Sequence, residues 1–539
     1  MSEVPHTRHV PDASCLARVY DGLEKAGQAP KTGARMSEFM DIITASNLTY
    51  GQKLIHLAQA AENTEHPIPT TPEYDWFFER DAICDMHEGN APYRPRYICC
   101  DVERFARQGS DFLRLDAPDN LDDLLMNLQI LYQNVPSVTG RPVYVGQLDR
   151  VFDPFLGDLA DDEILPRFKR FLNYIDRTVA SGYCHANLGP EDTRAGRLLL
   201  QADAEVQNAV PNFTLKYDPE VTPDDFARLA LQTSMACANP AYANDRMLRG
   251  TYPLATNGPK DGYTVVSCYN VLPIRGGAYC LDRVKLSQLA DLATSTEHFL
   301  NELLPNAVGA LLEYMDARIM FLVEESNFFQ TSFLVREGLI ERERFCGMFG
   351  MIGMHECIEK LMGPGHVYGT DPEANDLADL IMTKMTDQVL AWDAPYSEVG
   401  GGRYMMHAQA GFGDQTSSTP GVRIRVGSEP EVFFDHIRHC ARMHRFFTAG
   451  VSDIFPVEPT AAQNVDALLD VVKGAFAVDD KYLSFYPSDS DLVRITGFLV
   501  KRSEMEKFAR GEAVLADTSH DGEGNWRANA LADRKVRLG

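Results

Sequence analysis

The ten residues 491–500 read Asp-Leu-Val-Arg-Ile-Thr-Gly-Phe-Leu-Val, and the interpretation of the whole chain depends on this stretch. Most of them are strand formers, but Gly497 interrupts the run, although a glycine within a strand costs entropy and packs nothing. One explanation is a bulge or a close backbone contact. The other is chemical. Loss of a hydrogen atom from a glycine Cα leaves a planar radical, which the adjoining peptide groups delocalise and no side chain distorts.

A second stretch near mid-chain, residues 263–270, reads Tyr-Thr-Val-Val-Ser-Cys-Tyr-Asn and predicts a buried strand that runs into a loop. Cys268 stands at the end of this strand. Taken alone, it would be interpreted as a small buried thiol, as most free cysteines are.

The sequence Arg-Ile-Thr-Gly-Phe at 494–498 resembles the C-terminal signature of glycyl radical enzymes, usually Arg-Val-(small)-Gly-Tyr. Ile495 and Phe498 are conservative departures from it. The order of cysteine first and glycine last also agrees, and the resemblance is nearest to the YjjI-type members. It implies catalytic roles for Gly497, which would store an unpaired electron, and for Cys268. As a thiyl radical, Cys268 would take a hydrogen atom from the substrate and later return it. The resemblance implies no permanently bound cofactor. It further implies that a partner activase, an iron–sulfur protein using S-adenosylmethionine, installs the radical on Gly497.

Strands that alternate with helices predict an α/β barrel. Among the expected strands are 141–146, 212–217, 319–323, 403–407 and 422–426. The resemblance implies a specific form of this fold, a ten-stranded barrel of two antiparallel half-barrels with the cysteine and glycine loops inside.

Three parts are expected along the chain. Residues 1–135 form a mainly helical N-terminal part, 136–490 the barrel core with the cysteine loop, and 491–539 the C-terminal glycyl radical segment.

A polar stretch between residues 403 and 425 supplies candidates for substrate binding. Arg423 and Arg425 alternate on an expected strand, so both could enter the barrel and bind a carboxylate or phosphate, or both could face outward in surface ion pairs. His407 and the polar residues 414–419 lie nearby. Glu356 could act as an acid or base, or could cap a helix beside His355.

The residues after Cys268 bear on the reaction. Dehydratase and C–N lyase branches of the resembled family typically show Cys-Glu or Cys-x-Glu, whereas here Tyr269 and Asn270 follow the cysteine. The Cys-Cys pair of formate-lyases is also missing at this position. We expect lyase- or dehydratase-type chemistry on a small polar, potentially anionic substrate under anaerobic conditions. The alternatives are a ribonucleotide reductase-like enzyme and a non-catalytic homologue that serves as partner or scaffold.

A histidine and cysteine cluster falls on one predicted helical face: His436, His439, Cys440 and His444. Metal ligands can adopt such spacing, but helix packing is the favoured explanation and no metal site is predicted. The anaerobic reductases carry a four-cysteine zinc site just before the glycine loop. No cysteine follows Cys440 in this chain, so that site is not expected here.

Composition limits the class of protein. The 539 residues are 45% hydrophobic and 24% charged, which is typical of a globular protein. The formal net charge of −26 argues against nucleic acid and anionic membranes as partners. No secretory signal or membrane span is visible, and eleven scattered cysteines favour reduced thiols in a cytoplasm. The sequence is also compatible with a homodimer.

Overall fold

The computed structural model describes residues 33–86, 88–179, 182–252, 262–408, 418–448, 450–516, 518–529, 531–534 and 536. Contacts divide the chain into two units, residues 1–64 and 65–539. This boundary differs from the predicted ones at 135 and 490, and the three-part division stays a prediction. In the first unit, α2 (Gly33–Thr44) and α3 (Tyr50–Glu62) are separate helices, because Thr49 and Gln52 form a capping box that starts α3.

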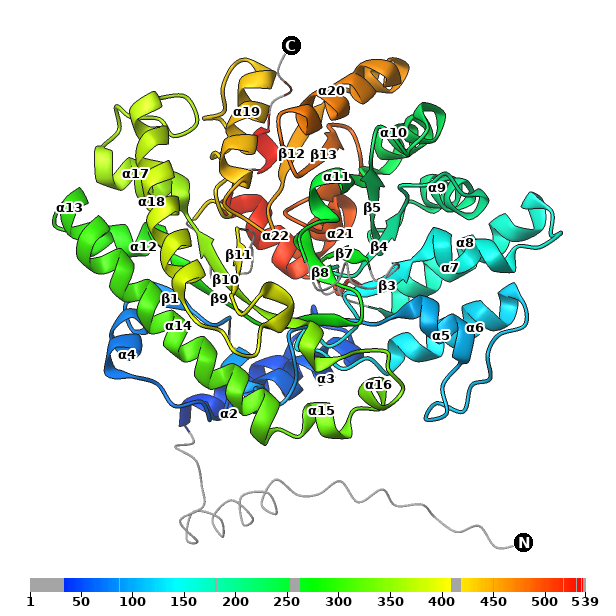
Figure 1. The fold of residues 1–539 in the computed structure, drawn as a ribbon, viewed down its shortest axis with the longest axis horizontal. Coiled ribbons are helices and arrows are strands. Elements are labelled where there is room, and N and C mark those ends of the chain that lie inside the picture. Colours follow the sequence, from blue (N-terminus) through cyan, green and yellow to red (C-terminus); the bar gives the residue numbers. More distant parts are fainter. Residues whose placement is uncertain are drawn as a thin grey trace, which may run out of the picture. The chain divides into compact units, whose positions relative to one another are not determined.

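One sheet of the second unit has six strands in the order β12-β13-β6-β5-β4-β3. Four neighbours, β3 to β6, are parallel, while β13 runs antiparallel to β6 and parallel to β12. The strands are β3 (Tyr144–Gln147), β4 (His185–Leu188), β5 (Asn212–Tyr217), β6 (Ala241–Asn244), β12 (Asp453–Val457) and β13 (Tyr482–Pro487). Helices α8 (Asp161–Thr178), α9 (Arg194–Val206) and α10 (Asp224–Cys237) lie outside this sheet (Figure 1).

The other large sheet has five strands. Its parallel centre is β9 (Gly276–Lys285), β10 (Phe345–Ile352) and β11 (Met405–His407). Two short strands, β1 (Ile83–Cys84) and β2 (Tyr97–Cys99), pair antiparallel with β9. On its outer side lie α12 (Leu286–Asp291), α14 (Leu304–Met320), α17 (Met354–Met362) and α18 (Pro372–Ala391) (Figure 1).

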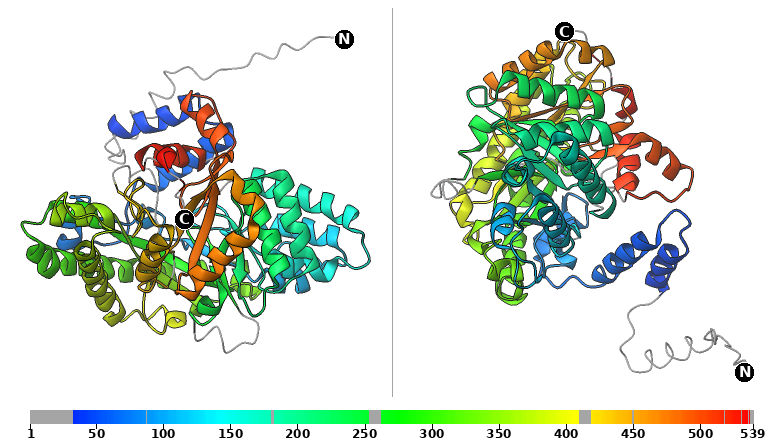
Figure 2. Two further views of the ribbon diagram at one scale, coloured as in Figure 1. Left: turned by 90° about the horizontal axis from the view of Figure 1, so that it is seen from above. Right: turned by 90° about the vertical axis from the view of Figure 1, so that its right-hand side faces the viewer.

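The remaining helices connect the strands or follow them. They are α4 (Pro72–Phe78), α5 (Val102–Gln108), α6 (Leu121–Gln133), α7 (Leu148–Phe152), α11 (Asp245–Leu248), α13 (Thr296–His298), α15 (Phe328–Thr331), α16 (Phe333–Arg336), α19 (Phe433–His444), α20 (Val465–Ala477), α21 (Arg502–Ala509) and α22 (Thr518–Ala528). The C-terminal helices α21 and α22 lie side by side in both views of Figure 2. None of the helices in the described ranges combines the length and apolarity that crossing a membrane requires.

Two β-hairpins complete the fold, and both are almost entirely buried. The cysteine hairpin pairs β7 (Tyr263–Val266) with β8 (Asn270–Pro273), and the glycine hairpin pairs β14 (Leu492–Arg494) with β15 (Leu499–Lys501). The stretches that were expected to be a strand entering a loop and a strand interrupted by glycine are therefore both antiparallel hairpins.

The α/β class agrees with the prediction, but the closed ten-stranded barrel is not formed by the described strands. Their hydrogen bonds define two separate large sheets, and no ladder joins β11 to β12 or β3 to β2 within the described ranges. The edge strand β11 has three residues and β3 has four, so each ladder ends after a few hydrogen bonds.

Two expected strands are wrong. Residues 319–323 continue the turns of α14, because Ile319, Leu322 and Val323 are buried while Met320 is exposed, which is a helical pattern. Residues 422–426 form no strand, since their backbone groups bond elsewhere. Val422 O accepts from the Tyr368 hydroxyl, Arg423 N donates to Pro420 O, and Arg425 N donates to His355 Nδ1.

Candidate active site

The tips of the two hairpins touch at Gly497 and Cys268. Cys268 is the middle residue of a three-residue tip, and Gly497 lies in a four-residue tip closed by a 3.0 Å hydrogen bond from Ile495 N to Phe498 O. A Cβ added to Gly497 would overlap the Cα of Cys268 and lie 2.5 Å from Ser267 O. The glycine therefore brings one backbone directly against the other. Both residues are buried, which excludes bulk water from the contact.

The backbone on either side of Cys268 is strained. Ser267 has φ 50° and Tyr269 φ 60°, the left-handed region that costs a non-glycine residue about 1–3 kcal/mol. Contacts on both sides hold this conformation. Ser267 N donates to Tyr183 O at 3.1 Å, and the Ser267 hydroxyl lies 2.9 Å from the Tyr97 hydroxyl. Gly450 N donates to Tyr269 O at 3.1 Å. The orientation of Cys268 is thus set by its surroundings and not by local preference.

Inward-facing side chains of the six-stranded sheet hold the cysteine hairpin. The amide of Asn187, on β4, donates to Val265 O and accepts from Val265 N, both at 2.9 Å. On β5, the ammonium of Lys216 donates to Tyr263 O at 2.5 Å, and burial lowers its pKa to about 8. These bonds replace the strand neighbours that β7 would have within a wider sheet.

Arg494 anchors the glycine hairpin. Its side chain is fully buried, and its guanidinium donates to Asn212 Oδ1 (3.2 Å), Tyr269 Oη (2.9 Å) and Ala238 O (2.7 Å). The first residue of the Arg-Ile-Thr-Gly-Phe sequence thereby connects the glycine hairpin to the cysteine hairpin and to the first residue of β5. No role for this arginine was expected from the sequence.

His185 contacts the backbone of Gly497 directly. Its Nε2–H donates to Gly497 O at 2.9 Å from a fully buried ring. Burial, with a smaller effect of Arg494, lowers the pKa of His185 to about 3, so that the imidazole is neutral at physiological pH. The acceptor of this hydrogen bond is the carbonyl group next to the Gly497 Cα. An unpaired electron on that carbon would be delocalised over this carbonyl. His185 lies in a polar stretch of the sequence, but nothing local indicated this partner.

The Cys268 side chain is a buried thiol. Its Sγ lies 4.0 Å from Thr496 Oγ1. Burial raises the pKa of Cys268 and outweighs the opposing effect of the Arg96 guanidinium. The group therefore stays protonated at neutral pH, which is unfavourable for a nucleophilic thiolate but suits a donor of a hydrogen atom.

Two polar side chains, those of Asn270 and His407, lie near the cysteine hairpin. Both amide atoms of the buried Asn270 side chain are without a hydrogen-bond partner among the described residues. Across Gly450 from it lies the ring of His407, because a Cβ on Gly450 would lie 2.8 Å from Asn270 Oδ1 and overlap that ring. Burial, together with Arg96 and Arg283, lowers the pKa of His407 well below its usual value. Of the predicted substrate-binding residues, His407 is the one placed beside the cysteine hairpin.

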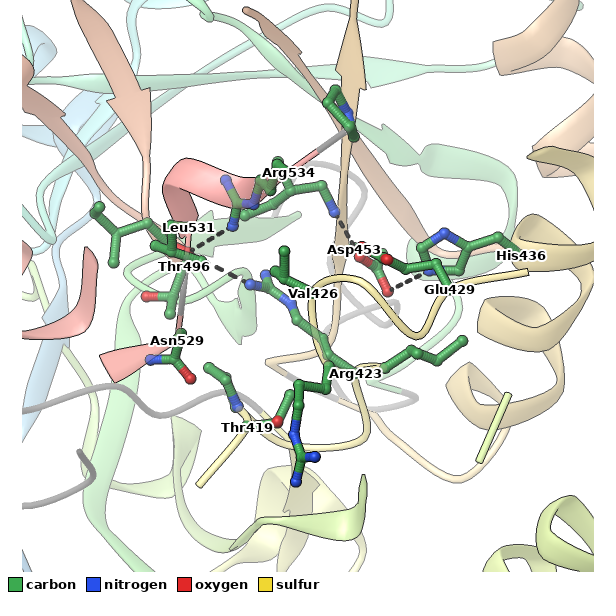
Figure 3. Close-up of a pocket in the computed structure, with 16 residues that line it drawn as sticks. Thr419, Arg423, Val426, Glu429, His436, Asp453, Thr496, Asn529, Leu531 and Arg534 are labelled. Carbon is green, nitrogen blue, oxygen red and sulfur yellow. Dashed lines mark hydrogen bonds and ion pairs between the residues drawn. The ribbon is translucent and has the colours of Figure 1, made fainter. Parts of the chain in front are cut away.

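Arg423 binds the backbone of the glycine hairpin. Its guanidinium donates to Ser452 O (3.0 Å) and Ile495 O (3.5 Å), while Arg534 donates to Arg494 O (2.8 Å). Figure 3 shows both arginines reaching toward the backbone beside Thr496. They line a cavity of about 40 Å³.

Arg425 and Glu356 pair with each other. The Arg425 guanidinium lies 3.3 Å from Glu356 and 2.7 Å from Glu359, and Glu356 also accepts hydrogen bonds from Thr419 N and Oγ1. The expectation that Arg423 and Arg425 point the same way fails because residues 422–426 are not a strand. The adjoining polar residues 414–417 lie outside the described residues.

The histidine and cysteine cluster divides among different partners. His436 and Cys440 face Asp453, His439 packs at 4.7 Å against the ring of Tyr368, and His444 pairs with Asp480 at 2.7 Å.

Comparison with known proteins gives a consistent result. The family model described as glycyl radical enzyme YjjI-like matches residues 48–537. An uncharacterized protein of Haemophilus influenzae is 40% identical over 513 residues, 94% of this chain and 98% of that protein.

Solved structures with a similar fold include an anaerobic ribonucleotide reductase and a protein of 1,2-propanediol dehydration. The anaerobic ribonucleotide reductase from Thermotoga maritima in complex with dATP and CTP has a TM-score of 0.65 at 13% identity, covering 94% of this chain and all of that one. A structure on 1,2-propanediol dehydration in Roseburia inulinivorans has a TM-score of 0.66 at 10% identity, covering 93% and 88%. At such identities these structures show similarity of fold alone.

Proposed function

The chain belongs to the YjjI-like family of glycyl radical enzymes, and from this premise we propose that Gly497 stores the radical and Cys268 carries it to the substrate. The observation that carries the proposal is the backbone contact between the two hairpin tips. Burial of both residues and the protonated state of the Cys268 thiol support it. In this proposal the six-stranded and the five-stranded sheet correspond to the two half-barrels of the family's fold and enclose the pair.

Each turnover is a sequence of balanced hydrogen-atom transfers. The hydrogen atom of the Cys268 thiol moves to the Gly497 Cα radical, which leaves a closed-shell glycine and a thiyl radical. The thiyl radical then takes a hydrogen atom from a substrate carbon. After the substrate radical has rearranged or eliminated, the product radical takes the hydrogen atom back from the thiol, and Gly497 returns one to the sulfur. A radical S-adenosylmethionine activase supplies the first radical.

For the reaction class we propose dehydration or a related elimination on a small polar substrate. A hydroxyl on the radical carbon would lose its proton to neutral His407, which would pass it to a hydroxide that leaves the neighbouring carbon, so that water is the second product. An amide cannot exchange protons in this way, so Asn270 would bind and orient a polar group of the substrate instead. The position of His407 across Gly450 from Asn270 and the unpartnered Asn270 amide support these roles.

The radical assignment is tested by electron paramagnetic resonance after anaerobic incubation with a radical S-adenosylmethionine activase, S-adenosylmethionine and a reductant. We expect a doublet, because one hydrogen remains on the Gly497 Cα. The splitting should collapse in protein produced with α-deuterated glycine, and the signal should persist in Cys268→Ser, which removes only the second carrier.

Glycine variants identify the position. Gly497→Ala should abolish the signal, whereas Gly474→Ala, at a helical position with no atom near its added Cβ, should retain it. A doublet that survives in Gly497→Ala, or one that deuterated glycine leaves unchanged, would overturn the assignment.

A further inference from the structure

Three side chains from two neighbouring elements, helix α19 and strand β12, converge beside the glycine hairpin. His436 and Cys440 lie one turn apart on α19, and Asp453 is the first residue of β12. His436 Nε2 lies 3.3 Å and Cys440 Sγ 3.2 Å from Asp453 Oδ2. All three ligand atoms lie within 4.8 Å of one another, and all three residues are buried.

The two distances to Asp453 Oδ2, 3.3 and 3.2 Å, are close to those expected around a four-coordinate metal ion. Zinc bonds of about 2.0–2.3 Å to nitrogen, oxygen and sulfur place tetrahedral ligand atoms about 3.3–3.8 Å apart. The set of one imidazole, one thiolate and one carboxylate is chemically suited to an ion of borderline softness. The two negative ligands would also balance a divalent charge.

The surroundings support a site with defined orientation. Asp453 Oδ1 accepts a 2.8 Å hydrogen bond from Ile454 N, which holds the carboxylate so that Oδ2 faces the other two groups. His436 and Asp453 form part of the wall of the cavity shown in Figure 3, so a fourth position is open to water or a small ligand. The positive charges of Arg423 and Arg534 would repel a cation in this site. Their N–H groups, however, point to backbone carbonyls and not to the three ligand atoms.

We propose that His436, Cys440 and Asp453 bind one divalent transition-metal ion, zinc foremost, with a fourth position open to the cavity. On binding, the Cys440 thiol releases one proton as the metal–sulfur bond forms. The ion would join α19 to β12 next to Ser452, whose carbonyl accepts from Arg423. Since Arg423 also contacts Ile495 O, the site would stabilise the position of the glycine hairpin.

The site is tested by titrating the chelator-treated full-length chain with Co²⁺, followed by competition with Zn²⁺. We expect one equivalent of Co²⁺ to bind and to produce a thiolate-to-cobalt charge-transfer band, which Zn²⁺ removes. Cys440→Ser should lose that band, and His436→Gln and Asp453→Asn should each weaken binding by at least about tenfold.

Matched controls separate this site from adventitious binding. His439→Gln, on the same helix but against Tyr368, and Cys357→Ser, a buried thiol elsewhere, should leave affinity and spectrum unchanged. Failure to bind one equivalent of either ion, or an unchanged spectrum in Cys440→Ser, would overturn the proposal. None of these measurements requires a radical on Gly497, so the result is independent of the proposed function.

Discussion

Gly497 has a steric requirement that is separate from any radical chemistry. A Cβ at this position would overlap the Cα of Cys268, and backbone atoms cannot rotate away as a side chain can. The close-contact explanation and the radical explanation of this glycine are therefore compatible. A position that must hold a radical beside its partner also needs the smallest residue.

We predict that Gly497→Ala destabilises the fold by about 1–3 kcal/mol, the usual cost of forcing added volume into a packed interior. Gly474→Ala, within helix α20 and with open space around it, should instead stabilise the fold by about 0.5–1 kcal/mol. Denaturant unfolding of the unactivated proteins measures both. Equal stability of Gly497→Ala and the parent chain would contradict the contact.

Arg494 gives a second prediction at the scale of the residue. Lysine keeps the charge but cannot reach Asn212, Tyr269 and Ala238 together, so Arg494→Lys should cost about 2–4 kcal/mol. The exposed Arg510→Lys should change stability by less than about 0.5 kcal/mol. Thermal unfolding distinguishes the two, and a neutral Arg494→Lys would show that the anchor is dispensable.

At the scale of the element, the cysteine hairpin depends on side chains of the neighbouring sheet. A two-stranded hairpin is marginal by itself, and the left-handed residues beside Cys268 raise its cost further. The bonds from Asn187 and Lys216 offset this cost by fixing the backbone of β7. The sulfur is thereby held at the tip while both hairpin strands stay buried.

We predict that Asn187→Ala lowers stability by about 2–4 kcal/mol, since it leaves the N–H and C=O of Val265 buried without a partner. In the Asn187→Ala variant, amide hydrogen exchange at Val265 should be faster than in the parent chain, and this increase should exceed any increase at residues of β5. In the control Asn134→Ala, an exposed position at the end of α6, no change in exchange of the hairpin is expected. Unaltered protection of Val265 in Asn187→Ala would argue against this clamp.

At the scale of the whole molecule, burial of neutral groups makes global stability depend on pH. In the folded chain, burial lowers the pKa of His185 to about 3, whereas a histidine in the unfolded chain titrates near about 6.5. Between these values the unfolded state binds a proton that the folded state does not. The contribution of His185 is therefore fully present above about pH 6.5 and is lost as the pH falls toward about 3.

The buried carboxyls act in the opposite direction. Burial raises the pKa values of Asp149 and Asp203 to about 7, so their contribution decreases as the pH rises from about 4 to about 7. The contribution of His185 is therefore obtained by comparing the parent chain with a variant that lacks this histidine. We predict that His185→Gln removes a contribution that rises with pH, so that between about pH 4 and 6 the slope of the unfolding free energy against pH becomes more negative by up to about 1.4 kcal/mol per pH unit. Parallel curves for the two proteins would contradict the neutral, buried state of His185.

The sequence by itself determined the local features. The apolar runs around Cys268 and Gly497 predicted buried strands, β5 spans the residues expected for it, and alternation of strands and helices indicated the α/β class. These patterns are enough to predict single strands and helices, because the spacing of apolar residues and the position of a glycine affect the backbone only within a few residues. They failed at 319–323, where a short apolar run does not distinguish strand from helix.

Only the tertiary structure decided which groups meet. The hydrogen bond from His185 to Gly497 and the anchoring by Arg494 join segments that are distant along the chain, and the approach of Asp453 to His436 joins two different elements. No local pattern encodes these partners, because each contact depends on how separate sheets, hairpins and helices pack. Arg425 illustrates the same point. The sequence left open whether it enters the barrel or forms surface ion pairs, and the packing of the chain places it against Glu356 and Glu359.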